Sequence, residues 1–171
     1  MPHDPMAINV KAKSYHMRRK EREITSRKEI TGLLTGLPYV TVAMCKDGVP
    51  YLVTVNHAYD AKANRIYFHC ARTGKKLDFM RANPHVMGQV IEDRGYVKDE
   101  CDYDYRTVHI EGIVHEVTSS KEMLHALSLL VAKFEQDTNE AREKFIKAAS
   151  VKRVAVYKID IESMTGKMRV P

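Results

Sequence analysis

Residues 39–71 read YVTVAMCKDGVPYLVTVNHAYDAKANRIYFHCA, and this stretch decides the fold class. β-branched and aromatic side chains recur, as is typical of strands, in three blocks: residues 39–45, 49–59 and 65–71. Asp47-Gly48 is a strong hairpin signal between the first two blocks, and the polar residues 60–64 turn the chain again. Because only turns connect the three strands, they pair antiparallel, which argues against a parallel, doubly wound sheet.

The rest of the chain carries further strand and helix signals. One capping box, Ser26-x-x-Glu29, begins a helix that ends near Gly36, and a second, Ser119-x-x-Glu122, begins a longer helix. The other predicted elements are, in chain order, a strand over residues 85–92, a polar loop over 93–104, a strand over 105–117, a helix over 140–149 and a strand over 152–161. Roughly six strands with helices between them predict a mainly β protein with flanking helices, built as an antiparallel barrel.

The longer helix has an apolar stripe at helical spacing. Leu124, Leu127, Val131 and Phe134 recur every three or four residues, and this spacing puts them on one face. We expect that face to pack in the core rather than to form a groove for a partner.

Length and composition are those of one globular domain. The chain has 171 residues, of which 44% are hydrophobic and 29% charged, and we expect a single domain over residues 17–171 after a flexible lead-in over residues 1–16. No apolar run approaches the ~20 residues that span a bilayer, and the N-terminus lacks the apolar core of a secretory signal. We therefore expect no membrane contact and a cytoplasmic location.

Charge and cysteine usage indicate which ligands and partners the chain can bind. The formal net charge is +6, but Glu21 and Glu23 interrupt the basic cluster of residues 17–20, so a nucleic-acid interface is less favoured than a small anionic ligand. The three cysteines form no C-x-x-C pair, and no two of the eight histidines have H-x-x-x-H spacing. We therefore expect reduced thiols and no metal site.

The helix that follows the 65–71 strand has an unusual start. It opens after Thr73 and Gly74 with Lys75 and Lys76, although helix starts usually favour acidic residues. Free backbone N–H groups, the positive end of the helix dipole, a hydroxyl and two ammonium groups converge there. Such a set suits an anion, and phosphate best of all. The alternative is a solvated basic turn.

Two strand ends are expected to face this helix start. His69 and Cys70 end the preceding strand, and Thr54, Asn56 and His57 come late in the adjacent one. A flat ligand lying along these strands can be bound at its polar edge by backbone groups, with its phosphate at residues 73–76.

Several runs together resemble one protein family. After an initial MRRKEREIT, these are residues 47–60 (DGVPYLVTVNHAYD), 66–86 (IYFHCARTGKKLDFMRANPHV), 101–117 (CDYDYRTVHIEGIVHEV) and 164–169 (MTGKMR). Their order and spacing resemble the pyridoxamine 5′-phosphate oxidase-like flavin-binding split-barrel proteins, most of all the 5-nitroimidazole resistance (Nim) branch. The resemblance implies a six-stranded antiparallel split β-barrel that forms a homodimer and binds FMN at the subunit interface.

The resemblance also implies roles for particular residues. Residues 52–57 match the strand beside the isoalloxazine ring, Lys75 and Lys76 match the basic pair that grips the phosphate, and Arg106 belongs to a polar pair near the site. His69 matches a histidine near the reactive face of the flavin and is the predicted catalytic residue. With the helix start included, the predicted cofactor-binding residues are Leu52, Val53, Thr54, Val55, Asn56, His57, His69, Cys70, Ala71, Thr73, Gly74, Lys75, Lys76 and Arg106.

The resemblance points to an FMN-dependent oxidoreductase. The flavin carries the chemistry, and NAD(P)H or a reduced carrier supplies electrons. Reduction of a nitroaromatic compound is one candidate reaction, with His69 donating a proton, since imidazole titrates near neutrality. Alternatively, His69 only contacts the ring. The chain has no tryptophan, which departs from the C-terminal segment of pyridoxamine 5′-phosphate oxidase itself, so oxidation of pyridoxamine phosphate is not expected.

Other interpretations stay open. A flavin- or haem-binding protein could serve storage, sensing or electron transfer without a substrate, with His16, His57 or His69 as the haem ligand. FAD and the deazaflavin F420 are alternatives to FMN. Tyr103 and Tyr105 either cover the flavin from a partner subunit or lie on the surface.

Overall fold

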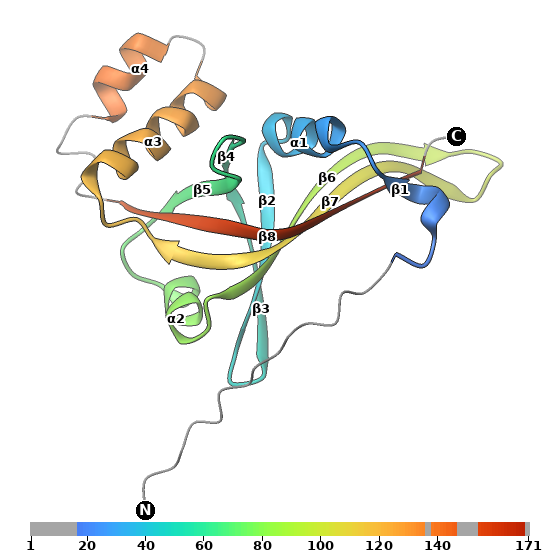
Figure 1. Ribbon diagram of the computed structural model, residues 1–171, viewed down its shortest axis with the longest axis horizontal. Helices are drawn as coiled ribbons and strands as arrows, with labels where there is room; N and C mark the ends of the chain where they lie inside the picture. The colour runs from blue at the N-terminus through green and yellow to red at the C-terminus, as the bar shows by residue number, and fades with distance from the viewer. Residues whose placement is uncertain (1–16, 136–137, 147–153, 170–171) are drawn as a thin grey trace, which may run out of the picture.

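The computed structural model describes residues 17–135, 138–146 and 154–169, and Figure 1 shows their arrangement. One antiparallel sheet dominates, with helices on both of its faces. The elements are η1 (Lys20–Arg22), β1 (Glu23–Ile24), α1 (Arg27–Gly36), β2 (Tyr39–Lys46), β3 (Val49–Asn56), β4 (Ala58–Asp60), β5 (Arg65–Cys70), α2 (Lys75–Ala82), β6 (His85–Val97), β7 (Asp102–Glu116), α3 (Ser120–Phe134), α4 (Thr138–Phe145) and β8 (Ala155–Arg169).

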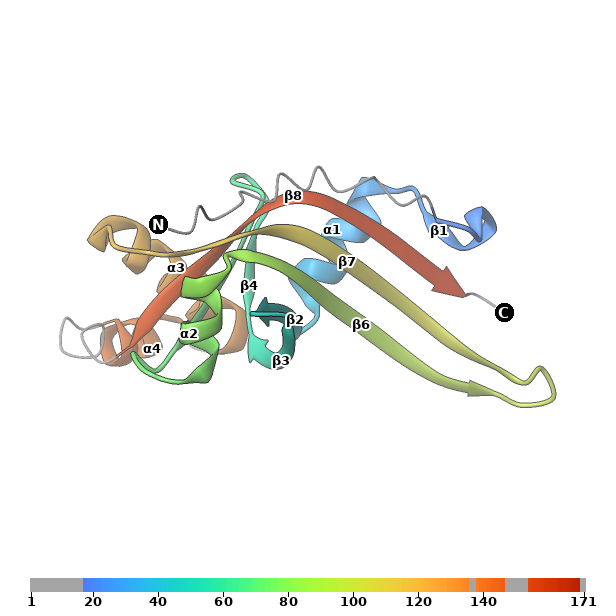
Figure 2. The same cartoon turned by 90° about the horizontal axis from the view of Figure 1, so that it is seen from below.

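The sheet bends back on itself because its two edges come from one segment of chain. The strand order is β3-β2-β6-β7-β8-β5-β4, and β1 pairs with β8. The edge strands β3 and β4 are consecutive in the chain and meet at His57, whose backbone N–H donates to the carbonyl of Pro38 over 3.3 Å. Figure 2 shows the resulting curvature of β6, β7 and β8. The predicted mainly β class with flanking helices is confirmed, with eight strands in the described residues instead of six.

Two predicted elements are wrong in detail. The predicted strand over residues 49–59 is broken at His57, because residues 58–60 leave β2 and pair with β5 instead. The predicted loop over residues 93–104 is mostly strand, since β6 and β7 stay paired out to Val97 and Asp102.

The ends of other predicted elements fall differently. β8 continues from residue 161 to Arg169 because it keeps pairing with β7 up to Tyr105. α4 ends at Phe145. Residues 147–149 of the predicted helix, residues 152 and 153 of the predicted last strand, and the predicted lead-in over residues 1–16 lie outside the described residues.

The sheet has an inner and an outer face, each with its own apolar cluster. The inner face carries the main core and packs against α1 and α2. The outer face of β5 and β8 packs against α3 in a second cluster, which includes Tyr67, Leu127 and Val156. Side chains of β5 alternate between the two, since Phe68 and Cys70 point inward and Tyr67 points outward. This alternation puts His69 on the outer face.

Two kinds of feature are absent from the described residues. No described helix is long and apolar enough to cross a membrane. In the same part of the chain, no three His, Cys, Asp or Glu side chains gather closely enough to hold a metal ion.

Candidate functional site

His69 borders an apolar cavity on the outer face of the sheet. The cavity measures about 340 Å³ and lies where α3 stops covering the strands. Its polar side chains are Asn56 at the end of β3, His69 near the end of β5, and Glu135 just after α3. The rest of the wall is apolar: Leu127, Leu130, Val131, Phe134 and Val154. A small flat molecule with a few polar atoms suits this composition.

The electrostatics around His69 favour its neutral form. His69 is exposed to solvent, but partial desolvation lowers its pKa below its usual 6.5, and the nearby charge of Lys76 lowers it further. Next to it, burial raises the pKa of the Cys70 thiol, which Lys76 opposes. Cys70 points into the main core and is 7% exposed, so only its backbone faces the outer side. At neutral pH the site therefore offers a neutral imidazole.

The start of α2 has an unusual backbone conformation and no side-chain cap. Gly74 is the residue before the helix, and it provides no side-chain cap. Its φ of 134° and ψ of 163° form a conformation that residues other than glycine rarely adopt. The first-turn N–H groups of Lys75 and Lys76 are thus left to a ligand or to water. The ammonium of Lys75 lies 4.6 Å from the ring centroid of Tyr51, which holds it near the sheet.

Only alternate side chains of β3 face outward. Leu52, Thr54 and Asn56 are exposed, whereas Val55 is buried, so Val55 can contact a ligand on the outer side through its backbone alone. Thr54 shares a hydrogen bond with Thr41 across the strand pair (Oγ1 to Oγ1, 3.0 Å). Among the described residues β3 pairs with β2 only, which leaves the backbone groups of its other edge for a ligand.

The structure places the side chain of His57 away from this cavity. The ring is fully buried, and its Nε2 lies 2.8 Å from the carbonyl oxygen of Leu34. Lys133 reaches the same place from α3, with its Nζ 3.5 Å from Nε2 and 2.6 Å from the oxygen of Leu37. Burial, helped by the charge of Lys133, lowers the pKa of His57 to about 4. The ring of His57 thus links the end of α1 to the break between β3 and β4.

Arg106 also lies apart from His69. Its guanidinium pairs with Glu92 through Nε at 2.6 Å and with Glu29 through Nη1 at 3.2 Å. These three side chains border a separate cavity of about 390 Å³ beside α1. The structure therefore brings together His69 and Asn56 at one cavity, and the charge of Lys76 at the start of α2 acts on His69. The side chains of His57 and Arg106 lie elsewhere.

Sequence reasoning missed the contribution of α3. Of the stripe expected in the core, Leu127 and Val131 are buried, whereas Leu124 is 43% and Phe134 39% exposed. Phe134 with Val131 forms a wall of the cavity. Lys133 was also missed. A single lysine inside the apolar run of residues 127–134 is the signal that could have drawn attention to it.

The family follows from a comparison with known proteins. Residues 26–168 match the model of the pyridoxamine 5′-phosphate oxidase family. The chain belongs to this family. An uncharacterized protein of Rhizobium meliloti is 30% identical over 114 residues, which cover 64% of this chain and 70% of that protein. The resemblance seen in the sequence is thus confirmed.

Solved structures confirm the split-barrel fold. A candidate 5-nitroimidazole antibiotic resistance protein from Bacteroides thetaiotaomicron is 22% identical, with 85% of each chain covered and a TM-score of 0.69. An FAD-binding protein from Mesorhizobium loti is 27% identical over 87% of this chain and 98% of its own, with a TM-score of 0.63. A flavocytochrome from Azotobacter vinelandii is 16% identical over 94% of this chain and 75% of its own, with a TM-score of 0.78.

Proposed function

We propose that this member of the family binds FMN and acts as a flavin-dependent oxidoreductase. The observation that carries the proposal is that His69 lines the apolar cavity and feels the charge of Lys76, which lies at the uncapped start of α2. The start of α2 would hold the phosphate of the cofactor, and β3 with His69 would border its ring system. The family match and the flavin-binding neighbours support a flavin as the cofactor.

The residues present fit the group. Lys75 and Lys76 hold the phosphate, and Gly74 lets it approach the backbone. The Asn56 amide and the free edge of β3 offer hydrogen bonds to the polar edge of the ring, while the apolar wall from α3 excludes water. When bound, the flavin supplies the electron transfer. The helix start offers a site for one phosphate, which suits FMN with its single phosphate better than FAD with two.

His69 is proposed to handle protons. An imidazole with a lowered pKa is mostly neutral at pH 7, and once protonated it is a stronger acid than an ordinary histidine. It can thus pass a proton from a ring nitrogen to an acceptor that gains electrons, such as a nitro group. NAD(P)H is proposed as the electron donor and the cytoplasm as the location.

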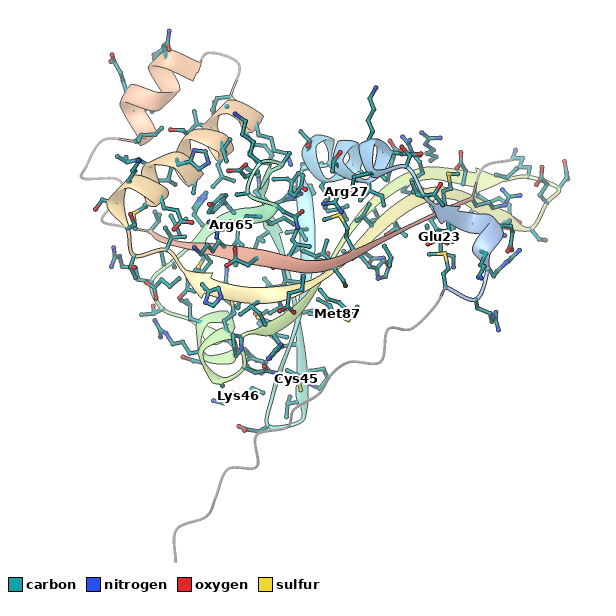
Figure 3. All side chains as sticks on the ribbon, viewed as in Figure 1. Glu23, Arg27, Cys45, Lys46, Arg65 and Met87 are labelled. Carbon is teal, nitrogen blue, oxygen red and sulfur yellow. The ribbon has the colours of Figure 1, made fainter. Side chains whose placement is uncertain are left out.

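We also propose that the working form is a homodimer. Large exposed apolar side chains gather on the outer face along β2, β3, β6 and β7, and Figure 3 shows one of them, Met87, on the side of the sheet away from α1. Such a patch marks an interface. We call it the outer apolar face; it consists of Tyr39, Leu52, Met87, Ile91, Tyr96 and Tyr103, each at least 45% exposed.

The visible absorbance of the purified protein, followed by titration with FMN, tests the cofactor. Bands at about 370 and 450 nm, or saturable binding with one FMN per chain, are expected. A protein that neither absorbs there nor binds FMN contradicts the proposal. A sharp band near about 410 nm would instead indicate haem.

A non-catalytic role is the second candidate. The flavocytochrome neighbour, and a further neighbour from Mycobacterium smegmatis described as binding FAD and haem (TM-score 0.72), favour a carrier of flavin or haem. Steady oxidation of NAD(P)H with a nitroaromatic or quinone acceptor supports the enzyme. Tight flavin binding without turnover supports the carrier.

A further inference from the structure

A row of polar side chains crosses the outer apolar face from strand to strand. The row is in register and consists of Thr54 on β3, Thr41 on β2, Gln89 on β6, His109 on β7 and Thr165 on β8. Met87 and Ile91 lie two residues away on either side of Gln89, so they share its side of the sheet. A partner that covers these apolar side chains therefore also covers the polar row.

A chain of hydrogen bonds in this row fixes the state of His109. The Thr107 hydroxyl donates to the carbonyl oxygen of Val90 over 2.8 Å, which leaves its oxygen to accept. The Gln89 amide nitrogen donates to Thr107 Oγ1 and to Nε2 of His109, over 3.2 Å in each case. A ring nitrogen that accepts carries no proton. The chain is thus complete only when His109 is neutral, with its proton on Nδ1.

Turning the Gln89 amide does not remove this restriction. A protonated His109 places an N–H group against the Gln89 amino group, and reversal of the amide relieves that contact. The amide oxygen then faces Thr107, whose one hydroxyl hydrogen is already donated to Val90. Because Thr107 is only 4% exposed, water does not replace the lost bond. Either arrangement of a charged His109 therefore loses a hydrogen bond.

The charges around His109 also disfavour its protonation. Partial desolvation lowers the pKa of His109 below its usual 6.5, and the charge of Lys167 on β8 lowers it further. The carboxylates on this side of the sheet are engaged elsewhere, since Glu111 accepts from the Ser163 hydroxyl and Glu23 of β1 lies opposite Lys167. In the described part of the chain, neither forms an ion pair with His109. The side chains of β6 that flank it are uncharged.

We propose that mild acid dissociates the homodimer, because association through the outer apolar face requires a neutral His109. This regulation rests on the homodimer of the proposed function. Covering the polar row takes His109 out of water, and an imidazolium without a carboxylate partner is costly to bury. Two-fold pairing brings two such charges, with two copies of Lys167, into one interface. The dimer is thus stable above the titration range of His109 and is lost as the pH falls through it.

Sedimentation of the full-length chain at pH 7.5 and 5.5, at constant ionic strength, tests the proposal. The dissociation constant of the wild-type dimer should be at least about tenfold higher at pH 5.5, because each copy takes up a proton on release and one pKa unit is a factor of ten. His109→Gln stays uncharged and can still accept from the Gln89 amide, so its constant should change less than about twofold. The control His125→Gln removes an exposed histidine of α3 and should keep the wild-type rise.

Thr107→Val tests the hydrogen-bond chain itself. Valine has a similar shape but no hydroxyl, so the Gln89 amide is free to turn its oxygen towards a protonated His109. The rise in dissociation constant between the two pH values should then be at least about threefold smaller than in the wild type. A purely structural role of Thr107 would instead weaken the dimer equally at both pH values and leave the rise unchanged.

The outcomes separate this inference from the proposed function. An equal or smaller dissociation constant at pH 5.5, or a rise that persists in His109→Gln, overturns the inference and leaves the homodimer in place. A wild-type chain that circular dichroism shows to unfold at pH 5.5, instead of dissociating as a folded monomer, also overturns it. A chain that is monomeric at pH 7.5 contradicts the proposed homodimer itself. If His109→Gln does not fold, the comparison of Thr107→Val with the wild type decides.

Discussion

The Nε2 atom of His57 lies 2.8 Å from the carbonyl oxygen of Leu34, and this contact joins the end of α1 to the break between β3 and β4. The ring is fully buried, and its Nδ1 has no partner in the described residues. A buried imidazole without a carboxylate nearby is stable only when neutral. The break between β3 and β4 is therefore stable only while the His57 ring is neutral.

Stability should fall in mild acid because of His57. Its pKa is about 4 in the folded chain against 6.5 for an ordinary histidine, so between these values the unfolded chain binds the extra proton. Stability is then present above pH 6.5 and lost as the pH falls towards 4, by roughly 3 kcal/mol in total. Urea unfolding at several pH values should show this slope shrinking in His57→Gln, but not in the exposed control His85→Gln. The same slope in all three proteins would refute the assignment.

Removal of the two lysines should abolish tight FMN binding and leave the fold intact. Two charge-assisted contacts to a phosphate contribute about 3 kcal/mol or more together, so Lys75→Ala with Lys76→Ala should raise the Kd for FMN by about 100-fold or more. Fluorescence titration of FMN measures the change. Arg81→Ala, in the last turn of the same helix, is the matched control and should bind normally. Unchanged affinity in the double variant would remove the case for a phosphate site.

The role of His69 should be visible in a pH profile. If it donates a proton, kcat with a nitro acceptor should decrease as the pH rises through its pKa, which lies below 6.5, and His69→Gln should lose this dependence while keeping its affinity for FMN. Steady-state rates between pH 5 and 8 decide the matter. A variant with the same profile and weaker FMN binding would show that His69 contacts the flavin without moving a proton.

Two glycines should respond in opposite ways to alanine. A Cβ on Gly112 would overlap the backbone carbonyl oxygen of Asp160 on the neighbouring strand, whereas a Cβ on Gly32 in α1 meets nothing within 4 Å. Gly112→Ala should therefore cost about 3 kcal/mol or more, and Gly32→Ala should stabilise the protein by about 1 kcal/mol, because alanine favours helix. Thermal unfolding compares the two. Equal melting temperatures would show that the strands separate more easily than the structure indicates.

The local parts of the site could be predicted, because they depend on neighbours in the chain. The strand that ends at His69 and Cys70 and the helix that opens with Lys75 both follow from patterns of a few residues. The apolar wall of the cavity could not be predicted in the same way. Whether Val131 and Phe134 face the core or the cavity depends on where α3 docks, and that position is set by tertiary contacts.

The errors in the fold have the same origin. Residues 93–104 are rich in charged residues and resemble a loop, but Arg22 and Arg169 come from distant segments to pair with Asp102 and hold the strands together. The run around His57 is mostly strand-forming, and Asn56 and Ala58 mark the break only weakly. The break arises from bonds to α1 and to Pro38, which the local pattern does not contain.

β8 pairs with β7, β5 and β1, so the last strand of the described residues lies inside the sheet. Without it, β5 and β4 have no strand pairing with the four-stranded piece β3-β2-β6-β7. During translation the ribosome releases β8 after all its neighbours. The nascent chain therefore waits with two open strand edges, and it depends on protection from aggregation until residues 155–169 emerge. β1 likewise has no strand partner until then, since Glu23 lies opposite Lys167 of β8.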